Sequence, residues 1–542
     1  MALRPFPGCR PARRRPRRPA TRFRATVAAA LAVVVVAAGC SGGGDKARHG
    51  DTFVYLSNEA IVTEWDPARS YSDEVVALSN LYETLTRYNA RTGRAEGLLA
   101  TSWTSSRDRR TWTFTLRPGV TFHSGRPLTA RAVKAAVERT RELKSGASYL
   151  WDPVRRITPL GTRKVRFELS RPASLDIIAS ASYAAYIYEV SDDPGYYRAA
   201  GRGTGPYTVG SWKPGAENEL ELTAYQDYWG GWDGDRYTEA VFRVVPQPST
   251  TAQLMRSGEG DYAESLPPQL LDTLRGRPGL AVRERPSWQT LLGLLNTRRK
   301  PLDDVRVRRA IAQGLDYEEL VAVNRGAYVA SDGVVPEGLL GHTDRLDLPG
   351  DDQDQARKLL AQAGYGPGSG RTVELELTYP EGEDTIRTMA GLMKAQLRPL
   401  GVDLKPVGLP WGSVQWPRAR SADPDERQDV FVMFWWPDDA EPLSYFRNVF
   451  RTEKEISYNL AYYSNPALDR LIDRVGAQTA TDPDGAERTY RTMQEMLIAD
   501  APALFLGTMT YQRVLSSRVE GFTDNPAYAN VVFFHELTRV RA

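Results

Sequence analysis

The sequence predicts an α/β or α+β fold, and three observations support this prediction. The chain has 542 residues, 41% hydrophobic and 25% charged, which is typical of a globular protein with two or more domains. After residue 50, stretches with strand periodicity alternate with stretches of helix periodicity. No internal repeat accompanies this alternation. The chain is therefore long enough to form a large core in more than one domain.

Strands are predicted where apolar residues recur at every second position between turn-forming residues. Trp112, Phe114 and Leu116 follow this pattern, and Pro118 with Gly119 predicts a turn, so we expect a β-hairpin here. Further strands are predicted at residues 53–57, 164–169, 207–212, 219–225, 373–379 and 429–435.

Helices are predicted where apolar residues recur at spacings of three and four. Thr129 is the expected N-cap of one helix, and Gly364 is expected to end another. The acidic pairs 303–304 and 351–352 are predicted at helix starts, where carboxylates stabilise the positive end of the helix dipole. Further helices are predicted at residues 304–315, 353–363, 384–400, 467–475 and 486–501.

Residues 1–39 have the layout of a secretory signal peptide. Nine arginines and no acidic residue are combined with the apolar stretch 25–38. As a helix this stretch would reach only about 21 Å, which is less than the roughly 30 Å hydrocarbon core of a bilayer. No window after residue 40 is long and apolar enough to cross a membrane. We therefore expect export and removal of the leader, not a permanent membrane span.

Loss of the leader changes the charge of the chain. It leaves 61 of the 70 basic residues against all 67 acidic residues, and it removes the only dense arginine cluster. A nucleic-acid-binding protein would keep a basic face after processing. We therefore expect no nucleic-acid partner.

Cys40 is the only cysteine after the leader, so no disulfide can form within the mature chain. Ala37, Ala38 and Gly39 before it resemble a lipobox, the site at which a peptidase cleaves just before a lipid-carrying cysteine. Two or more acyl chains hold a protein on a bilayer stably. We therefore expect Cys40 to be lipidated, residues 40–50 to be a flexible tether, and the protein to sit on the outer face of the cytoplasmic membrane.

Motifs for catalysis and metal binding are absent from the sequence. The four histidines, His49, His123, His342 and His535, are widely spaced, and His535 has no second histidine four residues later. After residue 50 the sequence has no G-x-S-x-G elbow, phosphate-binding P-loop or EF-hand pattern. We expect no catalytic residue, no metal ligand and no cofactor.

Aromatic and acidic residues meet at the end of one predicted strand. Trp435 and Trp436 are followed by Asp438 and Asp439, at the C-terminal end of strand 429–435. Ligands of open α/β sheets bind at such strand ends. A carboxylate beside indole rings suits a cationic ligand, although two solvated aspartates in a surface turn would give the same pattern.

Several stretches together resemble one family, the extracellular solute-binding proteins of family 5, which serve peptide and nickel ABC importers. They include residues 81–133, the Gly-Thr-Gly-Pro-Tyr segment with its Asp-Tyr-Trp-Gly-Gly ending at 203–231, and residues 295–321 and 356–365. The similarity runs from about residue 52 to residue 535, in the order the family shows.

The resemblance implies a two-lobed fold of the periplasmic-binding-protein type (class II, large family 5 form), with a hinge and an extra subdomain in the first lobe. The first lobe is expected at residues 51–92, 204–285 and 510–542, its extra subdomain at 93–203, and the second lobe at 286–509. A solute that contacts both lobes stabilises the closed form, and the importer can then distinguish loaded from empty protein.

The resemblance also assigns ligand-binding residues. Peptide-binding members carry a Trp-x-x-Asp-x-x-Glu-Pro pattern whose aspartate pairs with the ligand's α-ammonium, and here the pattern starts at Trp435 and assigns this role to Asp438. Trp411, Trp436 and Tyr82 complete the expected ligand-binding set. The best-known oligopeptide binders have an arginine three residues before the first tryptophan, where this chain has Val432.

The predicted function is a lipid-anchored, monomeric protein that captures peptides and delivers them to an ABC permease with its ATPase subunits. Within the family, an oligosaccharide, an opine-like solute or a nickel complex are the alternatives. Outside it, the alternatives are a peptide-sensing surface receptor and a secreted hydrolase, which would need a nucleophile with a base or a metal cluster.

Overall fold

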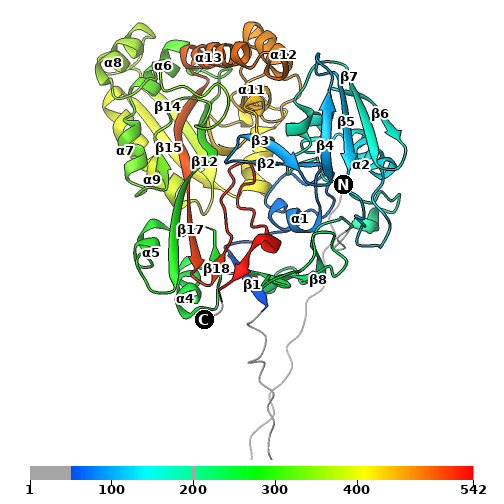
Figure 1. The fold of residues 1–542 in the computed structure, drawn as a ribbon. Helices are drawn as coiled ribbons and strands as arrows, with labels where there is room; N and C mark the ends of the chain where they lie inside the picture. Colours follow the sequence, from blue (N-terminus) through cyan, green and yellow to red (C-terminus); the bar gives the residue numbers. More distant parts are fainter. Residues whose placement is uncertain (1–50, 198–201, 265, 541–542) are drawn as a thin grey trace, which may run out of the picture. The chain divides into compact units, whose positions relative to one another are not determined.

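The computed structural model describes residues 51–197, 202–264 and 266–540 (Figure 1). The predicted signal peptide, the tether and Cys40 lie outside these residues. In the described part of the chain, no helix combines the length and the apolarity that crossing a membrane requires.

The largest element is a mixed sheet of 11 strands. Its order is β15-β14-β16-β12-β17-β11-β1-β10-β9-β8, and β13 also pairs with β17. The strands are β1 (Thr52–Ser57), β8 (Tyr207–Trp212), β9 (Asn218–Ala224), β10 (Glu239–Val244), β11 (Tyr262–Ala263), β12 (Leu280–Leu295), β13 (Tyr328–Val329), β14 (Val373–Pro380), β15 (Val402–Leu409), β16 (Val430–Trp435) and β17 (Ala503–Ser516).

Two long strands lie next to each other in the middle of this sheet. β12 has 16 residues and β17 has 14, and they pair antiparallel over most of their length. Their register shifts between Pro286 and Thr290, so the ladder has an irregular middle. Figure 1 shows both strands extending from the level of α13 to the level of α4. We call the part around β1 and β8–β11 the first lobe, and the part around β13–β16 the second lobe.

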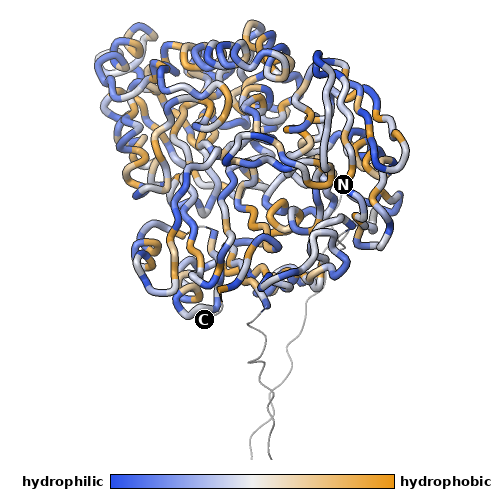
Figure 2. Tube along the Cα trace, in the orientation of Figure 1, coloured by the Kyte–Doolittle hydropathy of each residue, from blue (hydrophilic) through white to orange (hydrophobic). Residues whose placement is uncertain are grey.

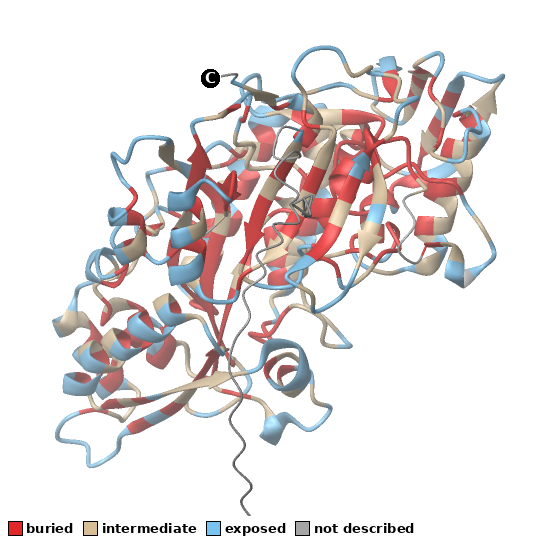
Figure 3. Ribbon diagram, turned by 90° about the horizontal axis from the view of Figure 1, so that it is seen from below, coloured by how far each residue is buried: buried red, intermediate tan, exposed pale blue. Residues whose placement is uncertain are grey.

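The strands of the large sheet are mostly buried, whereas the helices expose one face (Figure 3). The helices are α1 (Val75–Leu81), α2 (Ala130–Leu143), α3 (Leu175–Ile178), α4 (Pro248–Ser257), α5 (Pro268–Asp272), α6 (Val305–Gln313), α7 (Tyr317–Ala322), α8 (Gln353–Gln362), α9 (Asp384–Leu397), α10 (Trp416–Ala419), α11 (Leu443–Val449), α12 (Pro466–Thr481) and α13 (Pro483–Asp500). A separate hydrophobic core in the second lobe packs α6, α8 and α9 against β12, β14, β15 and β16.

Smaller sheets complete the first lobe. β4 (Ala100–Ser105), β5 (Thr111–Leu116), β6 (Val154–Leu160) and β7 (Lys164–Leu169) form a four-stranded antiparallel sheet, against which α2 packs. β2 (Thr86–Asn89) pairs with β3 (Arg94–Gly97), and β18 (Val519–Glu520) pairs with β19 (Thr538–Arg539).

The predicted hairpin after β5 is wrong. Gly119 has a positive φ of 76°, as a turn requires, but the residues after it form only an isolated bridge between Thr121 and Pro127. The neighbours of β5 are β4 and β7 instead. Apolar residues at every second position show that a strand has one buried face, but they do not identify its partner strand.

The predicted helix ends are confirmed where a side chain caps them. The Thr129 side chain accepts a hydrogen bond from the Ala132 N–H, and Asp304 and Asp352 cap α6 and α8 in the same way. Gly364 follows α8 with φ of +82°. In Figure 2 hydrophobic and hydrophilic residues alternate along these helices, as expected for helices with one buried face.

Two predicted helices differ from the structure by three or more residues at their C-terminal ends. The α-helical part of 384–400 stops at Leu397 and continues as a 3₁₀ turn, because Pro399 has no N–H to donate. α12 continues past the predicted end at Val475 to Thr481. Gly476 lies inside it, where an added Cβ would approach the Leu443 side chain to 2.9 Å, so α12 packs closely at this point.

Candidate functional site

Asp438 lies in the loop that connects β16 to α11. β16 is buried except at the half-buried Phe434, which fixes the position where the strand ends at Trp435 and the loop begins. The Asp438 backbone N–H donates to Ser444 Oγ at 3.2 Å, so the loop is tied to the first turn of α11. The side chain of Asp438 is only 4% exposed.

Three donors converge on the Asp438 carboxylate, two of them from distant parts of the chain. The Tyr71 hydroxyl donates to Oδ1 at 2.9 Å, and Asn448 Nδ2 on α11 donates to Oδ2 at 2.9 Å. The Tyr149 hydroxyl also bonds Oδ2, and Asn448 Nδ2 lies 3.1 Å from that hydroxyl. Tyr71 and Tyr149 belong to the first lobe, so this carboxylate links the two lobes.

No ion pair among the described residues includes Asp438. Arg447 is the nearby cation, and it pairs instead with Asp152 at 2.7 Å and stands over the Tyr149 ring. Burial raises the pKa of Asp438 to about 6, although its three hydrogen bonds and Arg447 act in the opposite direction. The carboxylate is thus satisfied by neutral donors and lacks a paired cation.

Two further carboxylates share the loop. Burial, with the neighbouring Glu441 and Asp438 charges, raises the pKa of Asp439, and burial raises the pKa of Glu441. Three acidic side chains therefore lie within four consecutive residues. A positively charged ligand group at this end of β16 would stabilise their ionised forms.

Aromatic rings form a continuous wall beside Asp438. Trp435 packs edge-on against Tyr458 at 5.3 Å, and Tyr458 also contacts Trp416 and Tyr71. Trp436 Nε1 donates to the Tyr183 hydroxyl at 2.8 Å, and Tyr183 packs on Tyr71.

Trp411 joins this wall through Trp416, at 5.3 Å between ring centroids. It is 43% exposed and opens the π-helical turn Trp411–Gln415 that follows β15. The structure therefore groups three predicted residues, Trp411, Trp435 and Trp436, in one aromatic wall next to Asp438.

The Trp435 indole is incompletely satisfied. The side chain is 6% exposed, and its Nε1–H is buried without a hydrogen-bond partner in the described part of the chain. Buried donors are rarely left unpaired, because the lost hydrogen bonds to water cost about 1–3 kcal/mol. This donor is therefore available to an acceptor on a ligand.

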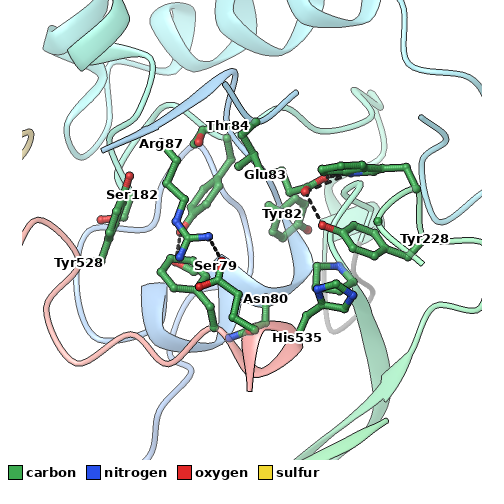
Figure 4. A pocket seen from close by; sticks show the side chains of 17 residues that line it. Ser79, Asn80, Tyr82, Glu83, Thr84, Arg87, Ser182, Tyr228, Tyr528 and His535 are labelled. Atoms are coloured by element: carbon green, nitrogen blue, oxygen red, sulfur yellow. Dashed lines mark hydrogen bonds and ion pairs between the residues drawn. The ribbon is translucent and has the colours of Figure 1, made fainter. Parts of the chain in front are cut away.

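Tyr82 lies outside the group of residues around Asp438. It is 1% exposed, its hydroxyl accepts from the Arg202 N–H at 3.4 Å, and its ring packs on Tyr186. It lines a cavity of about 290 Å³ within the first lobe (Figure 4), whose lining includes neither Asp438 nor its hydrogen-bond partners. The structure does not bring Tyr82 to the other four residues.

The histidines make backbone contacts. His123, His342 and His535 each have a ring nitrogen at 2.7–3.0 Å from a carbonyl oxygen, those of Gly205, Val335 and Gly231 respectively, and His49 lies outside the described residues. Within the described ranges, no group of three or more His, Cys, Asp or Glu side chains is arranged to hold a metal ion.

Sequence reasoning missed Tyr71, Tyr149 and Asn448. Tyr71 and Tyr149 are 367 and 289 positions from Asp438, so no local pattern connects them to it. Asn448 lies ten positions after Asp438 on the next helix, where an amide at that spacing is no recognised signal.

Comparison with known proteins places the chain among solute-binding proteins. Residues 94–456 match the model for bacterial extracellular solute-binding proteins, family 5. The probable D,D-dipeptide-binding periplasmic protein DdpA of Escherichia coli is 26% identical over 82% of this chain and 85% of its own.

Solved structures show the same fold. The periplasmic binding protein DppA of Helicobacter pylori, in complex with the peptide STSA, has a TM-score of 0.77 at 23% identity, over 90% of this chain and 98% of its own. NikA of Brucella suis, in complex with Fe(III)-EDTA, has a TM-score of 0.79 at 23% identity, over 90% of this chain and all of its own.

Proposed function

The chain belongs to family 5 of the bacterial extracellular solute-binding proteins, which are not enzymes, and we propose that it captures peptides through Asp438 for an ABC importer. The observation that supports this most is the Asp438 carboxylate, which is buried, lies between the lobes and lacks a paired cation. A peptide's α-ammonium supplies that cation.

The surroundings of Asp438 suit the rest of a peptide as well. The unpartnered Trp435 Nε1–H can donate to a peptide carbonyl, and the aromatic wall can cover apolar side chains without reading their identity. Relatives named as dipeptide-binding and di/tripeptide-binding proteins support the same ligand class. A charged group is stable in a low-dielectric site only when it is paired. The peptide ammonium must therefore lie at Asp438, and this contact determines the orientation of the bound peptide.

The test compares a free tripeptide with its N-acetylated form by isothermal titration calorimetry. Asp438→Asn removes the anionic partner, so the free peptide should lose about 2–5 kcal/mol of binding free energy, a range typical of a desolvated charge pair. The acetylated peptide should change little. The matched control is Asp484→Asn, which changes an exposed aspartate on α13. Equal losses for both peptides would contradict the ammonium role.

We also propose that Cys40 carries the lipid that anchors the protein, and that the protein works as a monomer beside its permease. The sequence support is the cysteine preceded by Ala37, Ala38 and Gly39 at the end of the leader. Intact-mass measurement of the membrane-extracted protein tests it. A chain that begins at an acylated Cys40 is expected, whereas an unmodified Cys40 would overturn the anchor.

A further inference from the structure

The cavity in the first lobe is built as a binding site in its own right (Figure 4). Its volume of about 290 Å³ is just below the roughly 300–1,000 Å³ of small-molecule pockets. Its lining comes from residues 79–98, 182–186, 206–230 and 528–536, all in the first lobe. A ligand here would not need the second lobe.

Glu83 places a buried carboxylate in the wall of this cavity. It is 5% exposed and accepts hydrogen bonds from Thr204 Oγ1 at 2.7 Å, from the Tyr228 hydroxyl at 2.9 Å and from Trp229 Nε1 at 2.9 Å. All these donors are neutral. No ion pair among the described residues includes Glu83, and burial raises its pKa to about 7.

The other charged groups at the cavity form no ion pair with Glu83 in the described part of the chain, although the Arg117 charge acts to lower its pKa. Arg87 is paired with Glu536 and lies 3.5 Å over the Phe533 ring. Arg117, outside the lining, stands over the Trp229 ring at 4.1 Å. Burial lowers the pKa of His535, which keeps the ring neutral at pH 7. The lining therefore carries one more negative than positive charge when Glu83 is ionised.

Among the described residues, one polar side chain of the cavity lining forms no hydrogen bond. Ser182 is 4% exposed, lines the cavity beside Tyr528, and its hydroxyl has no hydrogen-bond partner in the described part of the chain. A buried hydroxyl that faces a cavity can accept a hydrogen bond from an N–H of a ligand. Aromatic side chains also line the cavity, from Tyr82, Tyr186, Tyr228, Trp229, Tyr528 and Phe533.

We propose that this cavity is a second binding site, separate from the Asp438 site, and that it takes a small organic ammonium with an apolar body. The ammonium N–H groups bond the Ser182 hydroxyl, the Glu83 charge stabilises the cation, and the aromatic rings cover the apolar part. Peptide capture at Asp438 is not required for this binding.

Three probes of similar shape test the charge preference by isothermal titration calorimetry. Phenethylamine is a cation, 2-phenylethanol is neutral and phenylacetate is an anion. Phenethylamine should bind at least about tenfold more tightly than the alcohol, and the acid should bind most weakly. Binding of the acid as tightly as the amine would overturn the proposal, as would the absence of amine binding up to about 10 mM.

Three variants locate the site. Ser182→Ala should weaken amine binding at least about threefold and leave peptide binding unchanged. The matched control is Ser180→Ala, since Ser180 is equally buried but donates to the Ile177 carbonyl and does not line the cavity. Asp438→Asn should leave amine binding within about twofold of the unmodified protein. Loss of amine binding in Asp438→Asn, or no effect of Ser182→Ala, would overturn the second site without affecting the peptide proposal.

Discussion

The Asp438 carboxylate is buried and accepts hydrogen bonds from three neutral donors, and these two features determine its pKa. Tyr71, Tyr149 and Asn448 stabilise the ionised form, yet burial outweighs them and the pKa of Asp438 rises to about 6. The protonated form, which cannot pair with an ammonium, therefore predominates below pH 6 in the ligand-free protein.

Peptide affinity should follow this titration. A peptide α-ammonium has a pKa near 8 and stays charged below pH 7, so only Asp438 changes its state in this pair. Affinity should be full above about pH 7 and roughly tenfold weaker at pH 5, one unit below the pKa of Asp438. Calorimetric titrations between pH 5 and 7.5 measure this. The same series with Asp438→Asn should be nearly flat, and an equally steep series would assign the titration to another group.

At the scale of elements, the Gly-Thr-Gly segment 203–205 is pressed against the end of α1. A Cβ added at Gly205 would lie 2.6 Å from the Asn80 carbonyl oxygen, and one at Gly203 would lie 2.1 Å from the Leu81 carbonyl oxygen. Thr204, between them, donates to Glu83. Backbone atoms of a helix end cannot move aside as a flexible side chain can, so both positions require glycine.

Gly205→Ala should therefore lower the free energy of unfolding by at least about 2 kcal/mol, at the level of overpacked cores. Thermal or urea unfolding followed by circular dichroism measures it. Gly391 provides the matched control, because it lies in α9 with no atom within 4 Å of an added Cβ. Gly391→Ala should raise the free energy of unfolding by roughly 0.5–1 kcal/mol. Equal effects of the two variants would contradict the close packing at α1.

Most helices and strands could be predicted from the local sequence, because helix caps and the spacing of apolar residues depend on only a few neighbouring residues. Thr129, Asp304 and Gly364 mark helix ends for this reason. The partners of β5 and the neighbours of Asp438 depend on contacts between distant segments, which no local pattern encodes. Asp438 itself was accessible through a family pattern, whereas Tyr71 and Tyr149 became visible only when the fold brought them to it.

At the scale of the whole molecule, several polar contacts across the lobes lie around Asp438. Tyr71 and Tyr149 of the first lobe bond its carboxylate, Trp436 bonds Tyr183, and Arg447 pairs with Asp152. The two tyrosine hydroxyls bond the same carboxylate to which we assign the ligand's ammonium.

Removal of both hydroxyls should shift the ligand-free protein towards an open form. Tyr71→Phe with Tyr149→Phe keeps the rings and removes the bonds, so the radius of gyration from small-angle X-ray scattering should be larger than that of the unmodified protein. Addition of a peptide should return the double variant to the compact value and leave the unmodified protein compact. Identical ligand-free scattering would show that these bonds do not hold the lobes together.

The pairing of β12 with β17 has a consequence for recombination between related genes. Each lobe completes its share of the sheet with residues from both strands, Leu280–Pro286 and Thr510–Ser516 on one side and Thr290–Leu294 and Ala503–Thr508 on the other. A single gene crossover between two relatives would therefore join mismatched strand halves within one ladder. Exchange of an intact lobe requires two crossovers, one in each strand.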